Sequence, residues 1–376
     1  MSALPEEASA ATLAGLDRMT IGRLTALLAG NAPSAALAMI LGEVPPSGLA
    51  AKLFDIDGLL ATWRRGITQH PPEAMWEACV QRGIGVLLRG GCDYPAQLDL
   101  DPAAPAVLFV RGSFTSIMGR RVGVVGTRNA TSAGREAATT MGRDLAAAGV
   151  HVVSGLARGI DGCAHRGALG IEAASPVGVV ASGLDVVYPR EHRALWDAVA
   201  ERGVLVSEAP PGTQPEAHRF PLRNRIIAAL SEVLVVVESR ETGGSLLTVG
   251  EAKLRGVLVM AVPGSVSNRA ARGTNDLVRD GCPVATDATD VLVALGLDSR
   301  RAGAAIYDPR PRPEGADAAM LGLCREPRTL EQCCLLSGRT LVECAMSLAR
   351  LEVYGWLHQV NGWYEAIGPS GRGSAQ

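Results

Sequence analysis

Lysine and net positive charge are the two features that this 376-residue sequence most lacks. Only Lys52 and Lys253 are lysines, and 36 Lys and Arg residues stand against 38 Asp and Glu residues, which gives a formal net charge of −2. This balance excludes a polycation that coats nucleic acid through bulk charge, although it leaves a local basic groove open. Because the other cationic residues are all arginine, any anion site would be built from guanidinium groups and backbone amides.

Paired cysteines, long apolar runs and aromatic residues are also scarce. None of the eight cysteines forms a C-x-x-C pair or has zinc-ligand spacing, so we expect reduced thiols and no metal. No apolar run reaches the ~18 residues of a membrane span, and Glu6 and Glu7 stand where a signal peptide carries base. We therefore expect a cytoplasmic protein without membrane contact. Aromatic residues are 4% of the chain, so stacking on them is not expected to be the main grip on a ligand.

The remaining composition is that of a folded protein with several domains. Hydrophobic residues make up 47% of the chain, enough for a sizeable core. Residues 1–72 predict a small helical, SAM-like domain, because apolar residues recur three or four positions apart over 11–28, 34–41 and about 48–65. Such a bundle serves packing or docking, and it lacks the glycine hairpin of a helix-hairpin-helix contact with DNA.

Residues 73–297 predict a Rossmann-like domain whose core starts at about residue 106. Valine-rich strands alternate here with helical segments, which is typical of a parallel sheet covered by helices on both faces. The expected strands cover residues 121–126, 150–155, 176–182, 203–207, 232–239 and 256–264. The expected helices cover about 132–148, 162–170, 191–201, 223–231 and 245–255. The fold class is therefore α/β, with a doubly wound Rossmann-like parallel sheet.

The segment after residue 297 divides into three parts. Residues 298–316 are rich in Arg, Pro and Ala without a period and predict a linker. Residues 317–367 predict a C-terminal winged-helix domain, and residues 368–376 predict a disordered tail.

The winged-helix prediction depends on a helix–turn–helix followed by a hairpin. Thr329 is a helix cap, Ser337-Gly338 a turn, 340–351 a second helix, and Asn361-Gly362 a hairpin turn. Arg350 is the only cation inside that second helix, so contact with duplex DNA and docking to a protein both stay open.

Ligands of open parallel sheets bind beyond the carboxyl ends of the strands, so the loops there hold the candidate site. Neither a G-x-G-x-x-G motif nor a Walker A lysine follows any strand, which argues against bound NAD or ATP and predicts no cofactor. The loop Thr242–Thr248 is the best candidate for a phosphate-binding loop. Its two glycines let the backbone approach an anion, and Ser245 and Thr248 add hydroxyl donors at a helix start.

Arginine gathers in the same loops. Six arginines between residues 111 and 143 face a single glutamate, and residues 219–225 hold three arginines and no acid. We expect Arg128, Arg223 and Arg225 to converge on one rim at the strand ends, as a phosphate path requires. The alternative is a solvated surface that is rich in arginine through codon usage.

Six motifs follow one another between residues 122 and 264. They are VGVVGTRNATSAG (122–134), SGLARGIDGCAH (154–165), SGLDVVYP (182–189), FPLRNRIIAALS (220–231), GGSLLT (243–248) and VPG (262–264). Together they resemble the DNA-processing protein A family (DprA, also called Smf). The resemblance implies a bacterial, cytosolic protein that is not an enzyme and that forms a homodimer. It also implies that the protein binds and protects incoming single-stranded DNA and loads RecA onto it in natural transformation and homologous recombination.

The resemblance places the DNA contacts in three loops. They comprise Gly126, Arg128 and Thr131; Arg223, Asn224 and Arg225; and Gly244, Ser245 and Thr248. Backbone N–H groups and hydroxyls would bind phosphates, and arginines would add charge or stack on bases.

Some residues in these motifs depart from the family pattern or have a second reading. Ala133 replaces a usual aromatic residue, and Thr242-Gly243 replaces a usual basic residue and serine. Phe220 and Tyr188 are the nearest stacking candidates, although each also fits a core position. Asp161 and His165 are expected to brace their loop by hydrogen bonds instead of taking part in catalysis.

Two other functions fit parts of the sequence. A nucleotide-processing hydrolase with a Rossmann-like phosphate loop would need a general acid or base, and Glu238 or Glu241 would have to serve. A structural adaptor would dock partners through both end domains and leave the basic rim incidental.

Overall fold

The computed structural model describes residues 4–297, 310–311, 313–324 and 326–367. The chain divides into two compact units, Met1–Asp298 and Ser299–Gln376, and each is described by itself. The predicted tail, and the predicted linker up to residue 309, lie outside the described residues.

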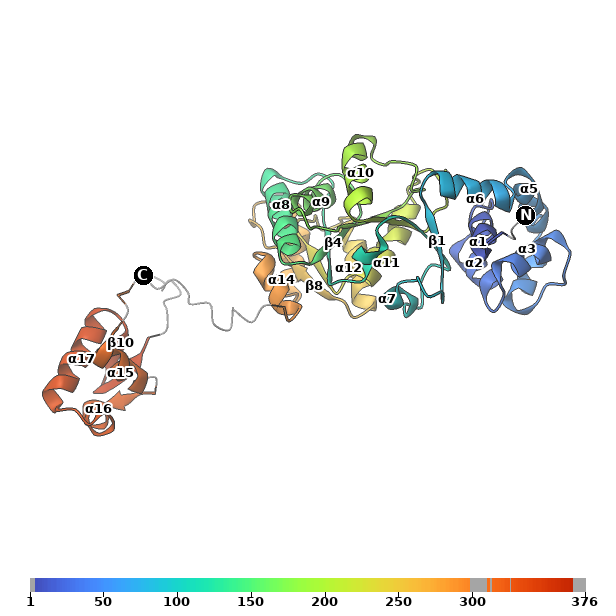
Figure 1. The fold of residues 1–376 in the computed structure, drawn as a ribbon. Coiled ribbons are helices and arrows are strands. Elements are labelled where there is room, and N and C mark those ends of the chain that lie inside the picture. The colour runs from blue at the N-terminus through green and yellow to red at the C-terminus, as the bar shows by residue number, and fades with distance from the viewer. Residues whose placement is uncertain (1–3, 298–309, 312, 325, 368–376) are drawn as a thin grey trace. The chain divides into compact units, whose positions relative to one another are not determined.

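The first unit begins with a group of helices. They are α1 (Glu6–Ala14), α2 (Ile21–Leu28), α3 (Pro33–Leu41), η1 (Gly48–Ala50), α4 (Ala51–Phe54), α5 (Leu59–Gln69) and α6 (Pro72–Gln81), drawn in blue in Figure 1. The prediction of one helix over 11–28 is wrong, because α1 ends at Ala14. Arg18 then takes a φ of +61°, and the Thr20 hydroxyl accepts a bond from the Arg23 N–H to cap α2. Among the described helices none alone has the length and apolarity to cross a membrane; α2 and α3 pass that test only as a bent pair.

An eight-stranded sheet forms the centre of the first unit. Its strands, in spatial order, are β1 (Gly85–Leu88), β2 (Val107–Gly112), β6 (Val204–Ser207), β5 (Val177–Val180), β4 (His151–Ser154), β3 (Arg121–Val125), β7 (Val233–Val236) and β8 (Leu258–Ala261). The six strands from β6 to β8 are parallel, which confirms the predicted Rossmann-like sheet.

The sheet is not parallel throughout. β2 runs antiparallel to β6, and β1 runs antiparallel to β2. A parallel neighbour needs a crossover of a dozen or more residues that is usually helical, whereas only the four-residue α7 (Ala96–Asp99) forms a helix between β1 and β2. Neither β1 nor β2 is among the expected strands, so this antiparallel edge is an addition to the predicted parallel sheet.

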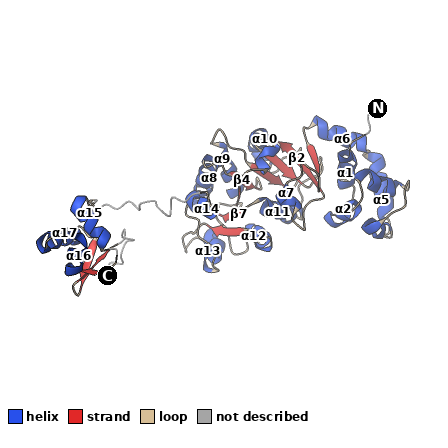
Figure 2. Cartoon of the chain, turned by 60° about the horizontal axis from the view of Figure 1, so that its bottom comes forward, coloured by secondary structure: helices blue, strands red, loops and turns tan. Residues whose placement is uncertain are grey.

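Helices cover both faces of the sheet, as Figure 2 shows. They are α8 (Ser132–Ala147), α9 (Ile160–Leu169), α10 (Arg193–Arg202), α11 (Arg219–Leu230), α12 (Ser245–Leu254), α13 (Arg272–Arg279) and α14 (Ala288–Ala294). The valines of β3 pack against the helices on both faces of the sheet, since successive side chains of a strand point to opposite faces. Val122 and Val124 belong to one core cluster with Leu145 of α8, and Val125 to another with Ile226 of α11.

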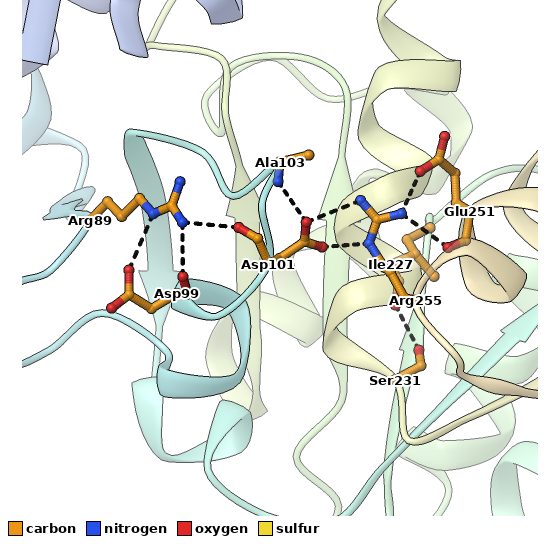
Figure 3. Close-up of polar contacts among 8 residues, drawn as sticks. All are labelled: Arg89, Asp99, Asp101, Ala103, Ile227, Ser231, Glu251 and Arg255. Carbon is orange, nitrogen blue, oxygen red and sulfur yellow. Dashed lines mark hydrogen bonds and ion pairs between the residues drawn. The ribbon is translucent and has the colours of Figure 1, made fainter. Parts of the chain in front are cut away.

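A polar network fixes the segment before β2 to the end of α12 (Figure 3). Arg255 donates to Glu251 at 2.5 Å and to both carboxylate oxygens of the buried Asp101. Asp101 also accepts from the Ala103 N–H at 2.7 Å, while Arg89 donates to the Asp101 carbonyl at 3.0 Å. The buried carboxylate is thus fully bonded, and the chain enters the sheet at a fixed place.

In its described residues, the second unit contains three helices and a small antiparallel sheet. They are α15 (Gly315–Leu323), β9 (Arg328–Thr329), α16 (Leu330–Ser337), α17 (Leu341–Val353), β10 (Leu357–Val360) and β11 (Trp363–Ala366), with strand order β10-β11-β9. Thr329 caps α16 as expected, and positive φ angles at Asn361 and Gly362 form the hairpin turn. This is the element order behind the winged-helix prediction, although α15 begins inside the predicted linker. Arg350 is paired with Asp317 at 2.7 Å, so the one cation within α17 is already engaged.

Candidate functional site

The sheet has a switch point between β3 and β7, the usual ligand crevice of an open α/β fold. In this chain the carboxylate of Glu238, directly after β7, fills that crevice. It accepts hydrogen bonds from the Thr131 N–H and hydroxyl, both at 2.8 Å, and from the Asn268 side chain at 3.2 Å. Glu238 is only 3% exposed. At the start of α8 the Thr131 N–H therefore already faces a carboxylate, and the Gly134 N–H bonds to the Thr131 hydroxyl.

Two glycines make this arrangement possible. A Cβ at Gly134 would lie 2.5 Å from a Glu238 carboxylate oxygen, and a Cβ at Gly126 would lie 2.5 Å from Ile160 and 2.8 Å from the Glu238 carbonyl. Thr131 caps α8 through its hydroxyl, which accepts from the Gly134 N–H at 3.0 Å. Gly126 and Thr131, both predicted DNA contacts, thus have structural roles here.

We expect Glu238→Ala to lower the free energy of unfolding by about 2 kcal/mol, because Thr131 and Asn268 lose a buried acceptor. Chemical denaturation measures this change. Glu241→Ala is the matched control, because Glu241 is exposed and should alter stability by less than about 0.5 kcal/mol. Equal losses in the two variants would contradict the bracing role of Glu238.

The predicted phosphate loop before α12 is partly closed. Ser245 is buried and its hydroxyl donates to that of Ser239 at 2.8 Å, and Thr248 is 2% exposed. A Cβ at Gly243 would lie 2.3 Å from the Ser239 hydroxyl, whereas Gly244 is exposed with open space around it. Of the three residues predicted in this loop, only Gly244 offers its backbone to a ligand at the surface.

The predicted RNR segment has a role that the sequence did not suggest. α11 begins at Arg219 instead of Arg223, because Pro221 lies in the first helical turn, where its missing N–H costs nothing. Arg223 and Arg225 are consequently buried in the helix, at 6% and 7% exposure. Asn224 between them is half-buried. The expectation that these two arginines form an open phosphate rim is therefore wrong for the side chains as the structure places them.

Arg223 braces the loop that follows β4. It donates to the Gly155 carbonyl at 2.9 Å and to the Val179 carbonyl, and burial lowers its pKa to about 10. Leu156 in this loop has a φ of +53°, a costly conformation for a residue with a side chain. Arg225 pairs with both carboxylate oxygens of Glu208 at 2.6 Å. The two arginines hold the loop and strand ends in place.

Arg128 is exposed and lies over one aromatic ring, which contacts a second. Its guanidinium carbon is 4.8 Å from the centre of the Phe220 ring, which lies 5.4 Å from the Tyr188 ring. Tyr188 is 40% exposed and Phe220 is half-buried, so neither is a core residue. We name the hollow beside them the aromatic pocket; it is lined by Arg128, Arg158, Ser182, Tyr188, Pro215 and Phe220.

The aromatic pocket joins motifs that are far apart in the sequence. It lies at the carboxyl ends of β4 and β5, since Gly155 and Val180 also line it. Arg158 and Ser182 were not predicted as site residues, although both lie inside the quoted motifs. The hollow itself is about 40 Å³, and its rim offers the exposed Arg128 guanidinium and the exposed Tyr188 ring to a flat, anionic ligand.

Asp161 bonds to the loop after β4, and His165 bonds to the neighbouring strand β5. Asp161 accepts from the Gly155 N–H at 3.1 Å, and a ring nitrogen of His165 lies 3.2 Å from the Val177 carbonyl. Burial raises the pKa of Asp161 and lowers that of His165 from 6.5 to about 4. These bonds confirm the bracing interpretation.

The buried His165 predicts a loss of stability in acid. Its pKa is lower in the folded than in the unfolded chain, so its contribution is complete above pH 6.5 and is lost as the pH falls towards 4. We expect this loss to total about 3 kcal/mol. The free energy of unfolding is measured for the wild type and for His165→Gln between pH 7 and pH 4. The difference between the two proteins isolates the contribution of His165, because the other titrating groups are the same in both. A difference that does not change with pH would contradict the assignment.

Comparison with known proteins places this geometry in a family. The model of the family "DNA recombination-mediator protein A" matches residues 85–296. DNA processing protein DprA of Bacillus subtilis (strain 168) is 38% identical over 216 residues, 57% of this chain and 72% of that protein.

Two solved structures share the fold. An X-ray structure of DNA processing protein A from Streptococcus pneumoniae has a TM-score of 0.63 and 27% identity, covering 78% of this chain and 98% of that one. A structure giving insight into the single-stranded DNA binding mode of the Helicobacter pylori protein has a TM-score of 0.51 and 24% identity, covering 56% and 95%. With its six motifs set around one sheet edge and more than half of its length matched by the family model, the chain belongs to the DNA recombination-mediator protein A family, the DprA proteins.

Proposed function

We propose that this chain binds single-stranded DNA at the aromatic pocket and acts there without catalysing a reaction. The observation that carries the proposal is the exposed Arg128 stacked over Phe220, with Tyr188 beside it. An unpaired base has two free faces for such a platform, whereas bases in a duplex are stacked on one another. The platform therefore favours a single strand.

The surroundings of the pocket suit a phosphate backbone. Arg158 is exposed and pairs with Glu191, and Gly244 presents open backbone after β7, which lies beyond β3 in the sheet. Arg223, Arg225 and Glu238 keep these loops in a fixed conformation. A preformed site loses less conformational entropy when a flexible strand binds.

Membership of the family supports the wider role. The family is described as a recombination mediator, and the Helicobacter pylori relative is described by its binding of single-stranded DNA. We extend this to a cytoplasmic protein that protects incoming single strands in natural transformation and loads RecA onto them. The test is assembly of RecA on an oligothymidine strand coated with a single-strand binding protein, which should be faster when this chain is present. An unchanged rate would reject the loading role.

A homodimer is part of the proposal. β8 is the last strand of the sheet; its last residue bonds to Pro283 and Ala285, and exposed apolar residues flank the strand in the sequence. Leu254 and Val266 are 81% and 90% exposed, and Leu258 on β8 is 39% exposed. Edge strands flanked by apolar side chains are suited to pairing with another chain.

The two candidate carboxylates of the nucleotide-hydrolase alternative both have partners in the structure. Glu238 is buried and fully bonded, and Glu241 pairs with Arg272 at 3.4 Å. Incubation with nucleoside monophosphates should release no free base. Robust release would overturn the proposal of a binding protein.

A further inference from the structure

A cleft of about 720 Å³ lies between the first helices and the sheet, apart from the aromatic pocket. Leu16, Met19 and Leu24 form its wall on the side of α1 and α2, and Leu222 and Ile226 of α11 form the opposite wall. Ligand pockets for small molecules have about 300–1,000 Å³, so the cleft has room for one nucleotide. None of the site residues predicted from the sequence except Arg223 lines it.

The cleft contains cationic donors that lack acceptors. Arg219 and Arg223 both line it, and in the described structure the Nε atom of each is buried without a hydrogen-bond partner. Arg223 is 6% exposed, so this is a built feature of the interior. Arg18 joins them on the opposite side. Buried N–H groups normally have partners, so the unpartnered Nε–H of Arg219 and that of Arg223 point to a missing acceptor.

The acids of the cleft do not supply that acceptor. Glu208 lines it, but both of its carboxylate oxygens are bonded to Arg225 at 2.6 Å. Asp17 is exposed and accepts from the Arg18 N–H. Apolar walls together with the two unpartnered Nε–H groups match a ligand that has a flat apolar part and an anionic part.

The cleft adjoins the aromatic pocket. Val180 and Ala181 line both, and the first turn of α11 separates them. Phe220 lies on the side of the aromatic pocket, and Arg219 and Leu222 lie on the side of the cleft. A strand stacked on Phe220 therefore reaches the cleft by passing one helical turn.

We propose that this cleft binds one nucleotide, with its base between the apolar walls and its phosphate on Arg219 and Arg223. The nucleotide belongs to the strand held at the aromatic pocket or is a free nucleotide. The proposal that the nucleotide belongs to the bound strand rests on the proposed function, whereas the proposal of a free nucleotide does not. The chemistry is the same in both, so separate experiments distinguish the two sources.

Gly22 offers a clean test, because it lines the cleft, is exposed and has nothing within 4 Å of its Cβ position. Gly22→Glu should weaken oligothymidine binding about tenfold at low salt by placing a carboxylate beside the phosphate. Gly22→Ala and Thr25→Glu should stay within about twofold, since the first adds no charge and the second adds it on α2 outside the cleft. Arg219→Gln should weaken binding as Gly22→Glu does.

The free-nucleotide experiment uses titration calorimetry with 5′-dAMP. If the wild type releases heat with dAMP and Gly22→Glu does not, the cleft binds a free nucleotide. If Gly22→Glu weakens oligothymidine binding and neither protein responds to dAMP, the cleft binds a nucleotide only as part of a strand. If Gly22→Glu and Arg219→Gln bind both probes as the wild type does, the inference is overturned. An acidic peptide that binds in the cleft where neither probe does would also overturn it. Failure of the proposed function has a different signature, because Arg128→Ala would then leave oligothymidine binding intact.

Discussion

Replacing Arg128 by alanine is expected to weaken binding of an oligothymidine strand by about 30-fold. The variant loses the guanidinium that lies 4.8 Å from the Phe220 ring centre, and with it one cation for the phosphate backbone. Arg128 is exposed and has no resolved role in packing, so the fold should be unaffected. Fluorescence anisotropy of a labelled strand measures the change.

The control for Arg128→Ala removes an equal charge elsewhere. Arg143 lies near the far end of α8, has a side chain that is 53% exposed and pairs with Asp144. Arg143→Ala should reduce affinity by less than about threefold, because a distant exposed charge is screened by salt. Arg128→Lys should fall between the two, since lysine keeps the charge but not the planar stack. Similar losses for Arg128→Ala and Arg143→Ala would show that bulk charge, and not the aromatic pocket, holds the strand.

Replacing Arg223 by methionine is expected to lower the free energy of unfolding by about 3 kcal/mol. Methionine keeps much of the volume but leaves the Gly155 and Val179 carbonyls without their donor. It also removes the charge whose attraction lowers the pKa of the buried Asp161, against the larger effect of burial. Chemical denaturation followed by tryptophan fluorescence gives the change.

Arg240→Met is the matched control for Arg223→Met, because Arg240 is exposed. It should shift stability by less than about 0.5 kcal/mol. If Arg223→Met were as stable as the wild type, the bracing role of Arg223 would be contradicted.

The sheet could be predicted because its signal is local and repeated. Four-residue valine-rich runs such as Val233–Val236 are buried on both faces, and only parallel strands between helical layers need that composition. The hairpin turn of the second unit depends on Asn361-Gly362, whose positive φ angles follow from residue type. The sequence does not predict the break between α1 and α2, because the break depends on a positive φ at Arg18 and arginine does not favour that conformation.

The candidate site could be predicted in its loops but not in the directions of its side chains. Arg128 lies in the loop after β3, whereas Arg223 and Arg225 lie within α11 and bond to residues at the strand ends. Which of them faces solvent depends on where α11 begins, and Pro221 permits a start at Arg219 that turns the later two arginines inward. The role of Glu238 was also hidden, because the Thr131 N–H that it binds is 107 positions away in the sequence.

The most direct test of the central claim is binding of one labelled sequence, as a single strand and as a duplex, across a series of salt concentrations. We expect the single strand to bind at least about tenfold more tightly at every salt concentration, because only its bases can stack in the aromatic pocket. Its affinity should fall with salt, with a logarithmic slope of about −0.7 for each phosphate contacted. Equal affinity for single strand and duplex throughout the series would contradict the account.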